Sequence, residues 1–575
     1  DTLVPALHLP DWFHSGVAFL LILGFPVAII FAWAFELTPE GLKKEKDVDR
    51  SESITHITSR KLDFVVIGLL VVALGYFAYD KFVLDPKRDT VMLESAARPS
   101  TEIVAQLEQA ETPPEAAYQS IAVLSFVNMS DDASNEYFSE GLSEELLNLL
   151  VKIPELRVAA RTSSFSYKGT GTKIAQIGQE LNVTHVLEGS VRKSGNQIRI
   201  TAQLVKADDG FHLWSQSYDR TLDNIFQIQD EIAAAVVDGL KITLLGAIPE
   251  SRNTDPEVYS LYLQGKYFNN LRGEENLEKA VLAFKQALAI DPDYAPAWVG
   301  ISWAYELQTR FRFETQAQGV ALAREAAERA LAIDDNMALA WSTIAFLKKT
   351  YEWDWQGAKA AIDKALQLEP NNADVIGAAA SLASTLGQLA KSIELFERTV
   401  ALDPLGLAGL IALGNRYSAG GRYDEALEKY NQVLALNPEY PRVRLYIVRN
   451  YLRQGNPERA LAEIDKLSVN LEYRQSIKAT VLFTLGEEME SQAITNEILE
   501  TSAEEYPLQM AIIYAWRGEN DSAFEWLEAA FEQRDGRLHN ILWIDALARL
   551  ESDPRYPVFL DKLGLLEAWK AMPPE

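Results

Sequence analysis

The sequence predicts a multidomain chain: a transmembrane α-helical hairpin, then an α/β domain of order β-α-β-α-β-β-β-α, then an all-α solenoid of paired helices. Three observations predict this fold class. Two long apolar runs lie within residues 1–84, strand-like and helical segments alternate over residues 118–245, and one helical frame recurs over residues 255–575. A chain of 575 residues is much longer than one domain of about 100–200 residues, so several units are expected.

Residues 12–35 form the first apolar run, which contains no Lys, Arg, Asp or Glu. About 20 such residues cross the ~30 Å hydrocarbon core of a bilayer as a helix. Trp12 and Trp33, near its two ends, suit the two membrane interfaces. A second, shorter run covers residues 62–84. We predict two transmembrane helices. A pair of buried core helices is the alternative, and the lack of a basic segment before the first run argues against a cleaved signal peptide.

The orientation of this hairpin follows from its basic residues, because short loops rich in Lys and Arg remain on the cytoplasmic side. The loop over residues 36–61 carries six Lys and Arg residues, whereas residues 1–14 carry none. The loop is therefore predicted to be cytoplasmic. In a bacterium this makes the chain a multi-pass protein of the inner (cytoplasmic) membrane, with its large C-terminal region in the periplasm.

Residues 85–117 mix charges, prolines and small side chains, and they are predicted to form a linker. Residues 118–245 then alternate between the two-residue period of strands and the longer period of amphipathic helices. The turn segments Ser194–Asn196 and Asp208–Gly210 separate three antiparallel strands. The predicted elements are strands over 120–126 and 156–161, helices over 135–152, 173–181 and 224–240, and the three-stranded meander between residues 184 and 220.

Four segments of this domain carry a family resemblance: SIAVLSFVNMSDDASNEYFSEGLSEEL, LRVAARTSSFSYKG, VLEGSVRKSGNQIRITAQLV and GFHLWSQSYDR. They resemble the TolB-amino-terminal-like domain of proteobacterial membrane proteins, which often lies between a membrane anchor and tetratricopeptide repeats. The segment FAWAFELTPEGLKKEKDVDRS is similar to the anchor region of the same group. Some members carry a winged-helix or class III adenylyl cyclase domain, and this sequence resembles the non-catalytic part of such cyclase-associated proteins. The resemblance also implies a further apolar helix upstream of Asp1.

Candidate catalytic groups are few, and we predict no enzyme, no catalytic residue, no cofactor and no metal site. Glu136, Glu140, Glu144 and Glu145 share helical spacing, which is typical of a solvated helix face. The six histidines lack a metal-ligand spacing, and cysteine is absent. Residues Gly169–Lys173 lack the frame of a phosphate-binding loop. A formal net charge of −28 opposes nucleic-acid binding.

The recurring frame of residues 255–575 is the best-defined pattern. The second helices of successive units end in ALAIDP, ALAIDD, ALQLEP, TVALDP and VLALNP, whose last residues are 43, 35, 34 and 34 positions apart. A period of about 34 is that of tetratricopeptide repeats (TPRs), in which two helices form a hairpin. Small residues such as Gly414 and Ala426 let paired helices approach, while Tyr417 and Tyr430 fill the space between neighbours. We predict seven or eight hairpins and a C-terminal cap.

The first helix of each hairpin lines the concave surface of such a solenoid, where extended peptides or partner helices bind. Four polar residues on or near first helices are candidate partner contacts, although a solvated surface explains them equally well. They are Asn415, Arg444, Asn450 and Arg453. An aromatic cluster in the third unit is a further candidate, for partner contact or for internal packing. Its members are Tyr351, Trp353 and Trp355.

Together these features predict a periplasmic scaffold or adaptor, anchored in the inner membrane, that binds partner proteins or forms a homo-oligomer. The alternative is a sensory or regulatory membrane subunit that couples periplasmic binding to a cytoplasmic effector such as a cyclase. The short loop over residues 36–61 argues against that alternative. An enzyme acting on cell-envelope material would need a polar pocket with perturbed carboxylates, which the sequence does not indicate. The predicted partners are proteins and the lipid bilayer, not nucleic acid.

Overall fold

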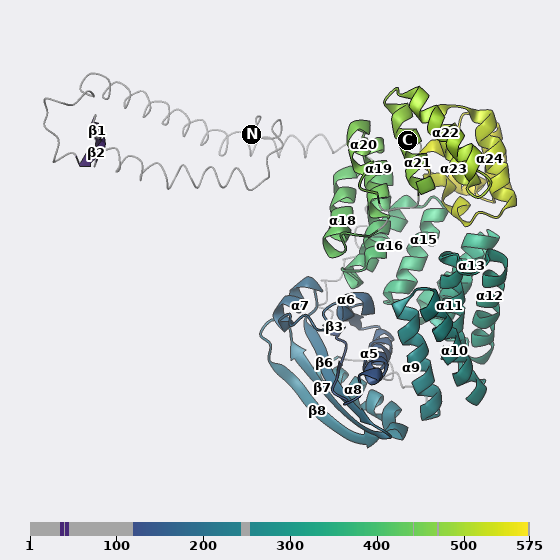
Figure 1. Ribbon diagram of the computed structural model, residues 1–575. Helices are drawn as coiled ribbons and strands as arrows, with labels where there is room; N and C mark the ends of the chain where they lie inside the picture. Colours follow the sequence, from purple (N-terminus) through teal and green to yellow (C-terminus); the bar gives the residue numbers. More distant parts are fainter. Residues whose placement is uncertain are drawn as a thin grey trace, which may run out of the picture. The chain divides into compact units, whose positions relative to one another are not determined.

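The computed structural model describes residues 35–38, 41–44, 119–242, 254–440, 442–467 and 471–572 (Figure 1). The chain divides into two compact units, residues 1–114 and 115–575.

The first unit has one described feature, an antiparallel pair of strands. β1 (Phe35–Thr38) pairs with β2 (Gly41–Lys44), with Phe35 opposite Lys44. Phe35 thus begins a strand and does not end the predicted first helix. The rest of both predicted transmembrane helices, and the linker over residues 85–117, lie outside the described residues. Within the described residues, no helix combines the length and apolarity needed to cross a membrane.

The second unit begins with an α/β domain built on a single sheet. Parallel strands β3 (Gln119–Val123), β5 (Leu156–Val158) and β6 (His185–Ser194) continue into antiparallel β7 (Gln197–Lys206) and β8 (His212–Thr221). The order is β5-β3-β6-β7-β8, and the short strand β4 (Val127–Asn128) also pairs with β6. The predicted three-stranded meander is thus β6 to β8.

Helices cover both faces of this sheet. Because side chains alternate along a strand, Ile121 and Val123 of β3 face one core and Ala122 faces the other. Helices α5 (Glu136–Val151) and α8 (Ile225–Gly239) pack on the first face, and α7 (Ile174–Glu180) packs on the second. The short helix α6 (Arg161–Phe165) follows β5, and its Arg161 pairs with Glu144 of α5.

The strand predicted over residues 156–161 is shorter in the structure. Ala160 donates its amide to the carbonyl of Leu402 in the solenoid at 2.8 Å, not to a neighbouring strand. The backbone therefore leaves the sheet after Val158, and Arg161 begins α6.

Paired helices occupy the rest of the chain, and eight hairpins are present among residues 254–572 (Figure 1). Close packing within a hairpin requires small residues: a Cβ on Gly414 would lie 2.6 Å from Cε1 of Tyr430. The hairpins are α9 (Pro256–Leu271) with α10 (Glu274–Ile290), α11 (Ala295–Arg310) with α12 (Gln316–Ile333), α13 (Ala338–Leu347) with α14 (Trp355–Leu368), α15 (Ala373–Thr385) with α16 (Leu389–Leu402), α17 (Leu407–Ala419) with α18 (Tyr423–Leu436), α19 (Val443–Arg453) with α20 (Pro457–Ile464), α21 (Leu471–Thr484) with α22 (Glu488–Thr501), and α23 (Pro507–Arg517) with α24 (Asn520–Glu532).

The third hairpin is irregular at its turn. A π-helical segment, η6 (Lys348–Glu352), follows α13, and Trp353 then adopts a left-handed conformation with φ of 58°. The Asp354 side chain accepts a hydrogen bond from the amide of Gly357 and so caps α14.

The C-terminal segment both caps the last hairpin and returns to the middle of the stack. It comprises η7 (Gly536–Trp543), α25 (Asp545–Ala548), α26 (Arg555–Lys562) and α27 (Leu566–Lys570). Trp543 donates its indole N–H to the carbonyl of Ser384 at 2.6 Å, and Trp355 donates to the carbonyl of Leu563 at 2.9 Å. These bonds close the end of the solenoid onto its third and fourth hairpins.

The α/β domain and the first hairpins share one hydrophobic core, with α5 packed against α9 (Figure 1). Gly141 allows the contact, because a Cβ there would lie 2.8 Å from Cδ2 of Leu263. Lys266 Nζ lies 2.9 Å from Glu144 and 2.6 Å from Glu145. The prediction of a solvated face is therefore wrong for Glu144, whose side chain is only 13% exposed beneath α9.

Candidate binding pocket

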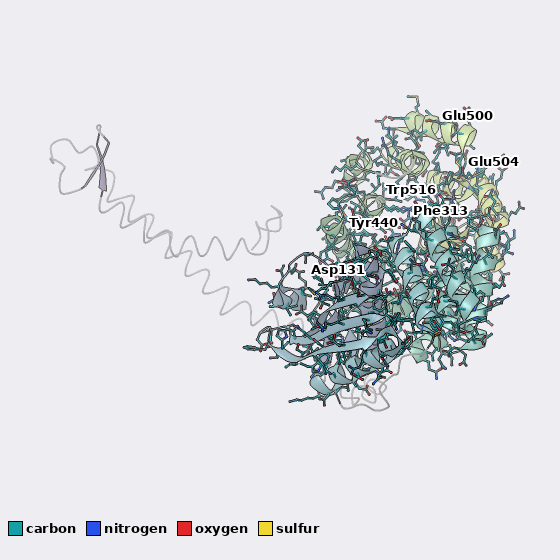
Figure 2. All side chains as sticks on the ribbon, turned by 60° about the horizontal axis from the view of Figure 1, so that its bottom comes forward. Asp131, Phe313, Tyr440, Glu500, Glu504 and Trp516 are labelled. Atoms are coloured by element: carbon teal, nitrogen blue, oxygen red, sulfur yellow. The ribbon has the colours of Figure 1, made fainter. Side chains whose placement is uncertain are left out.

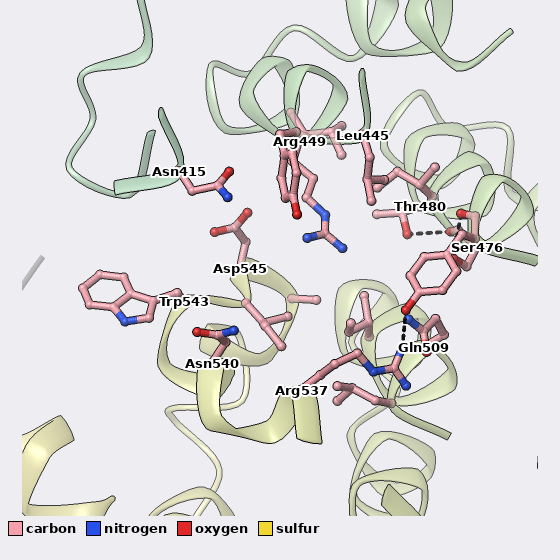
Figure 3. A pocket seen from close by; sticks show the side chains of 18 of the residues that line it. Asn415, Leu445, Arg449, Ser476, Thr480, Gln509, Arg537, Asn540, Trp543 and Asp545 are labelled. Atoms are coloured by element: carbon pink, nitrogen blue, oxygen red, sulfur yellow. Dashed lines mark hydrogen bonds between the residues drawn. The ribbon is translucent and has the colours of Figure 1, made fainter. Parts of the chain in front are cut away.

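A pocket of about 780 Å³ lies on the inner side of the last four hairpins (Figure 3). The first helices α17, α19, α21 and α23 supply most of its lining, as expected for the concave surface of a helical-hairpin solenoid. Residues of η7 and α25 form the opposing wall. The returning C-terminal segment therefore converts an open groove into a pocket.

The lining of this pocket is strongly cationic. Six of its described lining residues are arginines and one, Asp545, is acidic, although the chain as a whole carries a net charge of −28. Acidic residues such as Glu500 and Glu504 are exposed at the outer edge of the C-terminal hairpins, with Trp516 further in (Figure 2). The arginines are Arg312, Arg416, Arg442, Arg449, Arg453 and Arg537.

Arg453 of α19 binds Asp545 of α25 across the pocket. Its Nε lies 2.8 Å from both carboxylate oxygens, and its Nη2 lies 2.6 Å from Oδ1. The same guanidinium donates to Ser418 Oγ and to the carbonyl of Trp543. Burial opposes the charge of Arg453, but Asp545 holds its pKa above the ordinary value.

Arg416 of α17 lacks a carboxylate partner among the described residues. Its guanidinium donates to Ser384 Oγ and lies 5.1 Å from the centre of the Trp543 ring. Burial and the nearby charge of Arg453 lower the pKa of Arg416 to about 10. Two guanidinium groups therefore repel each other on this wall, and only one of them is neutralised.

Arg449 points into the space between the two walls (Figure 3). Neither Arg449 nor the exposed Arg442 forms a hydrogen bond or ion pair with the side chain of any other described residue. The Tyr430 and Tyr446 rings stack nearby, with centroids 6.1 Å apart and an interplanar angle of 21°. The Tyr430 hydroxyl donates to Asn415 Oδ1 at 2.8 Å.

Arg537 of η7 is fixed on the opposite wall. It pairs with Asp535 and donates to the Tyr473 hydroxyl and, at 2.7 Å, to Gln509 Oε1 (Figure 3). Arg312 pairs with Glu505 at 2.8 Å. The charges of these two arginines are thus balanced, whereas Arg416, Arg442 and Arg449 have no carboxylate partner among the described residues.

The structure brings two of the sequence-predicted polar residues, Asn415 and Arg453, into the pocket. Arg444 lies outside it and pairs with Glu463 at 3.1 Å. Asn450 is fully buried and donates to the carbonyl of Tyr423 at 3.1 Å, which ties α19 to the preceding hairpin.

The aromatic cluster of the third hairpin is used in internal packing, against α24, α13 and the returning C-terminal segment. The Trp353 ring lies 4.9 Å from that of Phe531, and Trp355 is bonded to Leu563 as described above. Tyr351 contacts the ring of Phe346 at 6.0 Å. All three aromatic residues lie outside the pocket lining.

Sequence reasoning did not single out Arg416, Arg442 or Arg449. A signal for two of them existed: Arg442, Arg449 and Arg453 are separated by seven and four positions, a spacing that places them on one helix face. Arg444 and Asn450 fall off that face. No sequence pattern indicated that η7 lines the pocket, because this depends on the C-terminal segment folding back onto the solenoid.

Comparisons with known proteins agree with the repeat architecture. The tetratricopeptide repeat family matches residues 418–469. "Putative adenylate cyclase 3" of Rhizobium meliloti (strain 1021) is 41% identical over 202 residues, 34% of this chain and 34% of that protein. "DnaJ homolog subfamily C member 7 homolog" of Schizosaccharomyces pombe (strain 972 / ATCC 24843) is 25% identical over 224 residues, 35% of this chain and 47% of that protein. The matches thus span less than half of either relative.

Two solved structures are also similar. The human IFIT1 dimer with m7Gppp-AAAA has 14% identity and a TM-score of 0.36, covering 53% of this chain and 77% of that one. PilF of Pseudomonas aeruginosa has 19% identity and a TM-score of 0.30, covering 38% and 96%. From the helical hairpins and the family match, the C-terminal part of this chain is a TPR solenoid following an α/β region, an architecture of protein-interaction scaffolds.

Proposed function

We propose that this chain is a membrane-anchored scaffold whose solenoid holds a segment of a partner protein in the pocket of α17 to α25. One observation carries the proposal: Arg, Tyr and Trp side chains gather in a single concave pocket on the inner helices. These three residue types dominate the binding energy of protein interfaces. The volume of about 780 Å³ suits a short segment, not a folded domain.

In this proposal the α/β domain is a rigid extension of the solenoid. It shares a core with α9 and hydrogen-bonds the turn between the fourth and fifth hairpins. By resemblance we propose that it is a TolB-amino-terminal-like domain, whose surface provides a second binding site for a partner or for another copy of the chain. The proposed role is binding and assembly, without a catalytic step.

The location is likewise a proposal, supported by the two apolar runs and the basic loop over residues 36–61. We propose that residues 12–35 and 62–84 cross the inner membrane and that the region from residue 85 onward is periplasmic. A topology reporter fused after residue 90 tests this. Alkaline phosphatase activity supports the proposal, and activity of a cytoplasm-dependent reporter at the same site contradicts it.

Affinity capture tests the scaffold role. The full chain is isolated from native membranes in mild detergent, and retained proteins and particle size are measured. A stoichiometric partner, or a closed oligomer, is expected for wild type. Tyr446→Ala, which shortens one wall of the pocket, should reduce retention, whereas Met489→Ala should not, because Met489 is 90% exposed on α22 and lies outside the pocket lining. A monomer without retained protein contradicts the proposal.

A second candidate function is regulation of a cytoplasmic effector such as a cyclase. The partial match to "Putative adenylate cyclase 3" favours it. In that case the chain would couple binding in its C-terminal region to the loop over residues 36–61. Co-purification of a cyclase with wild type, lost when residues 36–61 are replaced by a neutral linker, would favour this function over a purely structural scaffold.

A further inference from the structure

We infer that the pocket binds an acidic peptide segment, whose carboxylates pair with Arg416, Arg442 and Arg449. This inference rests on the proposed function and names the chemistry of the partner segment.

The first support is the charge balance of the pocket. Among its six arginines, Arg312, Arg453 and Arg537 have carboxylate partners, and the other three have none among the described residues. A partly buried cation without a counter-ion, as at Arg416 and Arg449, is costly, and an incoming anion relieves that cost; the exposed Arg442 adds positive charge at the edge of the pocket. The lowered pKa of Arg416, caused by burial and by Arg453, reflects the same unbalanced charge.

The second support is that the chain already binds a carboxylate here. Asp545 is held by Arg453 through Nε and Nη2, in the two-pronged geometry by which a guanidinium recognises a carboxylate. Asp545 comes from a segment 92 positions away in the sequence. The contact therefore shows, within one molecule, how an acidic side chain is accommodated against this wall.

The third support is the shape and lining around the unpaired cations. Arg449 projects from α19 into the space that faces η7 (Figure 3), and the stacked Tyr430 and Tyr446 rings line the same pocket. The tyrosine rings can cover the aliphatic part of a peptide while the guanidinium groups meet its charges. Asn540 of η7 and Gln509 of α23 add amide groups to the lining, suited to a peptide backbone.

Phosphate groups share the chemistry of carboxylates, so a nucleic acid is the competing ligand. The pocket favours a peptide because its cations are confined to about 780 Å³. A nucleic-acid strand leaving the pocket would pass over a protein of net charge −28, whose field repels a phosphate backbone. A short acidic segment flanked by neutral residues meets little of this repulsion.

The test measures binding of a fluorescein-labelled N-acetyl-hexaglutamate amide to the full chain in detergent, by fluorescence anisotropy at low salt. The pocket variant R416Q/R442Q/R449Q is compared with R329Q/R398Q/R459Q. The latter removes the same charge from the second helices of hairpins, outside the pocket lining. We expect at least about tenfold weaker binding for the pocket variant and a change within about twofold for its control.

Further arms of the same titration identify the ligand class. R449Q alone should weaken binding about threefold, and because Arg449 forms no hydrogen bond or ion pair with the side chain of another described residue, this single change should leave the fold intact. Hexalysine and hexaglutamine peptides should bind at least about tenfold more weakly than hexaglutamate. Equal binding by the pocket variant and its control, or by hexalysine, overturns the inference. Tighter binding of hexa-adenylate or of pyrophosphate than of hexaglutamate also overturns it and assigns the pocket to phosphates.

The capture experiment separates this inference from the proposed function. If wild type and the pocket variant retain the same partner equally, the scaffold function stands and the acidic-segment inference fails. If neither wild type nor control retains any protein or forms an oligomer, the proposed function fails, whatever the peptide titration shows. Circular dichroism of each variant verifies that it is folded.

Discussion

Ser163 of the α/β domain and Asp403 of the solenoid are joined by two hydrogen bonds. The Ser163 hydroxyl and amide both donate to Asp403 Oδ1, at 2.6 and 3.1 Å. Ser163 Oγ in turn accepts the amide of Leu405 at 2.9 Å. Asp403 therefore satisfies a free amide in the first turn of α6, the task that a capping residue within the same segment usually performs. The solenoid thus completes a helix of its neighbouring domain.

Asp403→Ala should loosen this junction. Loss of a helix cap costs about 0.5–2 kcal/mol, which corresponds to faster opening of α6 by up to roughly thirtyfold. Hydrogen–deuterium exchange of residues 161–166 measures this opening. Asp363→Ala is the matched control, since Asp363 forms only an exposed pair with Lys359. Unchanged exchange in Asp403→Ala would show that the junction is held by its apolar contacts alone.

Lys266→Met should destabilise the contact between α5 and α9. Lys266 is 13% exposed and pairs with Glu144 and Glu145, so its removal leaves Glu145 without this cation and Glu144 with Arg161 alone beneath a helix. Breaking a buried pair in this way costs about 3–5 kcal/mol. Lys279→Met removes an exposed pair with Glu275 and should cost under about 1 kcal/mol. Thermal unfolding followed by circular dichroism compares the two variants, and similar midpoints would contradict the expected role of Lys266.

The part of the fold that local patterns specify could be predicted from the sequence. Tetratricopeptide hairpins depend on small and large residues within one repeat, such as Gly414 against Tyr430, and their spacing is visible in the chain. The closure of the solenoid could not be predicted, because it depends on Trp353 meeting Phe531 from a distant hairpin. Of the pocket, Asn415 and Arg453 were identified by their place on first helices. Which of the pocket arginines are neutralised could not be predicted, because this depends on the position of Asp545 in the folded chain.

Burial of Lys349 should make the stability of the solenoid depend on pH. It is 5% exposed, with Nζ 2.8 Å from Ser381 Oγ, and burial followed by the charge of Arg310 lowers its pKa to about 7, with Glu306 acting in the opposite direction. The unfolded chain therefore binds a proton more readily between about pH 7 and 10.5, and the free energy of unfolding rises with pH across that range. The stability is therefore highest above about pH 10.5, where Lys349 is neutral in both states, and this gain is lost as the pH falls through about 7.

Lys349→Met should remove this dependence. The variant is expected to be more stable than wild type near pH 7, by on the order of 1–3 kcal/mol, and the difference should shrink toward pH 10. Thermal midpoints at several pH values measure the effect, with Lys359→Met as an exposed control. A constant difference between wild type and Lys349→Met across this range would contradict the assigned protonation.

Trp353→Ala should loosen the contact between the third and last hairpins and, with it, the C-terminal segment that follows α24 and shares this core. The ring is 9% exposed and packs on Phe531, and removing a buried tryptophan costs about 3–5 kcal/mol. Trp353→Phe should cost much less, because the indole N–H has no hydrogen-bond partner in the described structure. Limited proteolysis of residues 535–572 measures the release. Protection of this segment in Trp353→Ala would contradict the closure of the solenoid through the third hairpin.

Asn415 and Asn450 were both predicted as partner contacts on first helices, and substitutions at the two positions distinguish an effect on binding from an effect on stability. Asn450 is fully buried, and its amide donates to the carbonyl of Tyr423, so Asn450→Ala should destabilise the solenoid by about 1–3 kcal/mol. Because it lies outside the pocket lining, hexaglutamate affinity should stay within about twofold of wild type at a temperature where the variant is folded.

Asn415→Ala should have the opposite profile. Asn415 is half-buried in the pocket, where it orients the Tyr430 hydroxyl beside the arginine wall. Its loss removes one hydrogen bond, worth about 0.5–1.5 kcal/mol, and lowers hexaglutamate affinity by a comparable free energy. Paired thermal melts and anisotropy titrations of the two variants measure both quantities. An affinity loss in Asn450→Ala larger than in Asn415→Ala would place the ligand on the other face of α19, because Asn450 and the pocket arginines point to different sides of that helix.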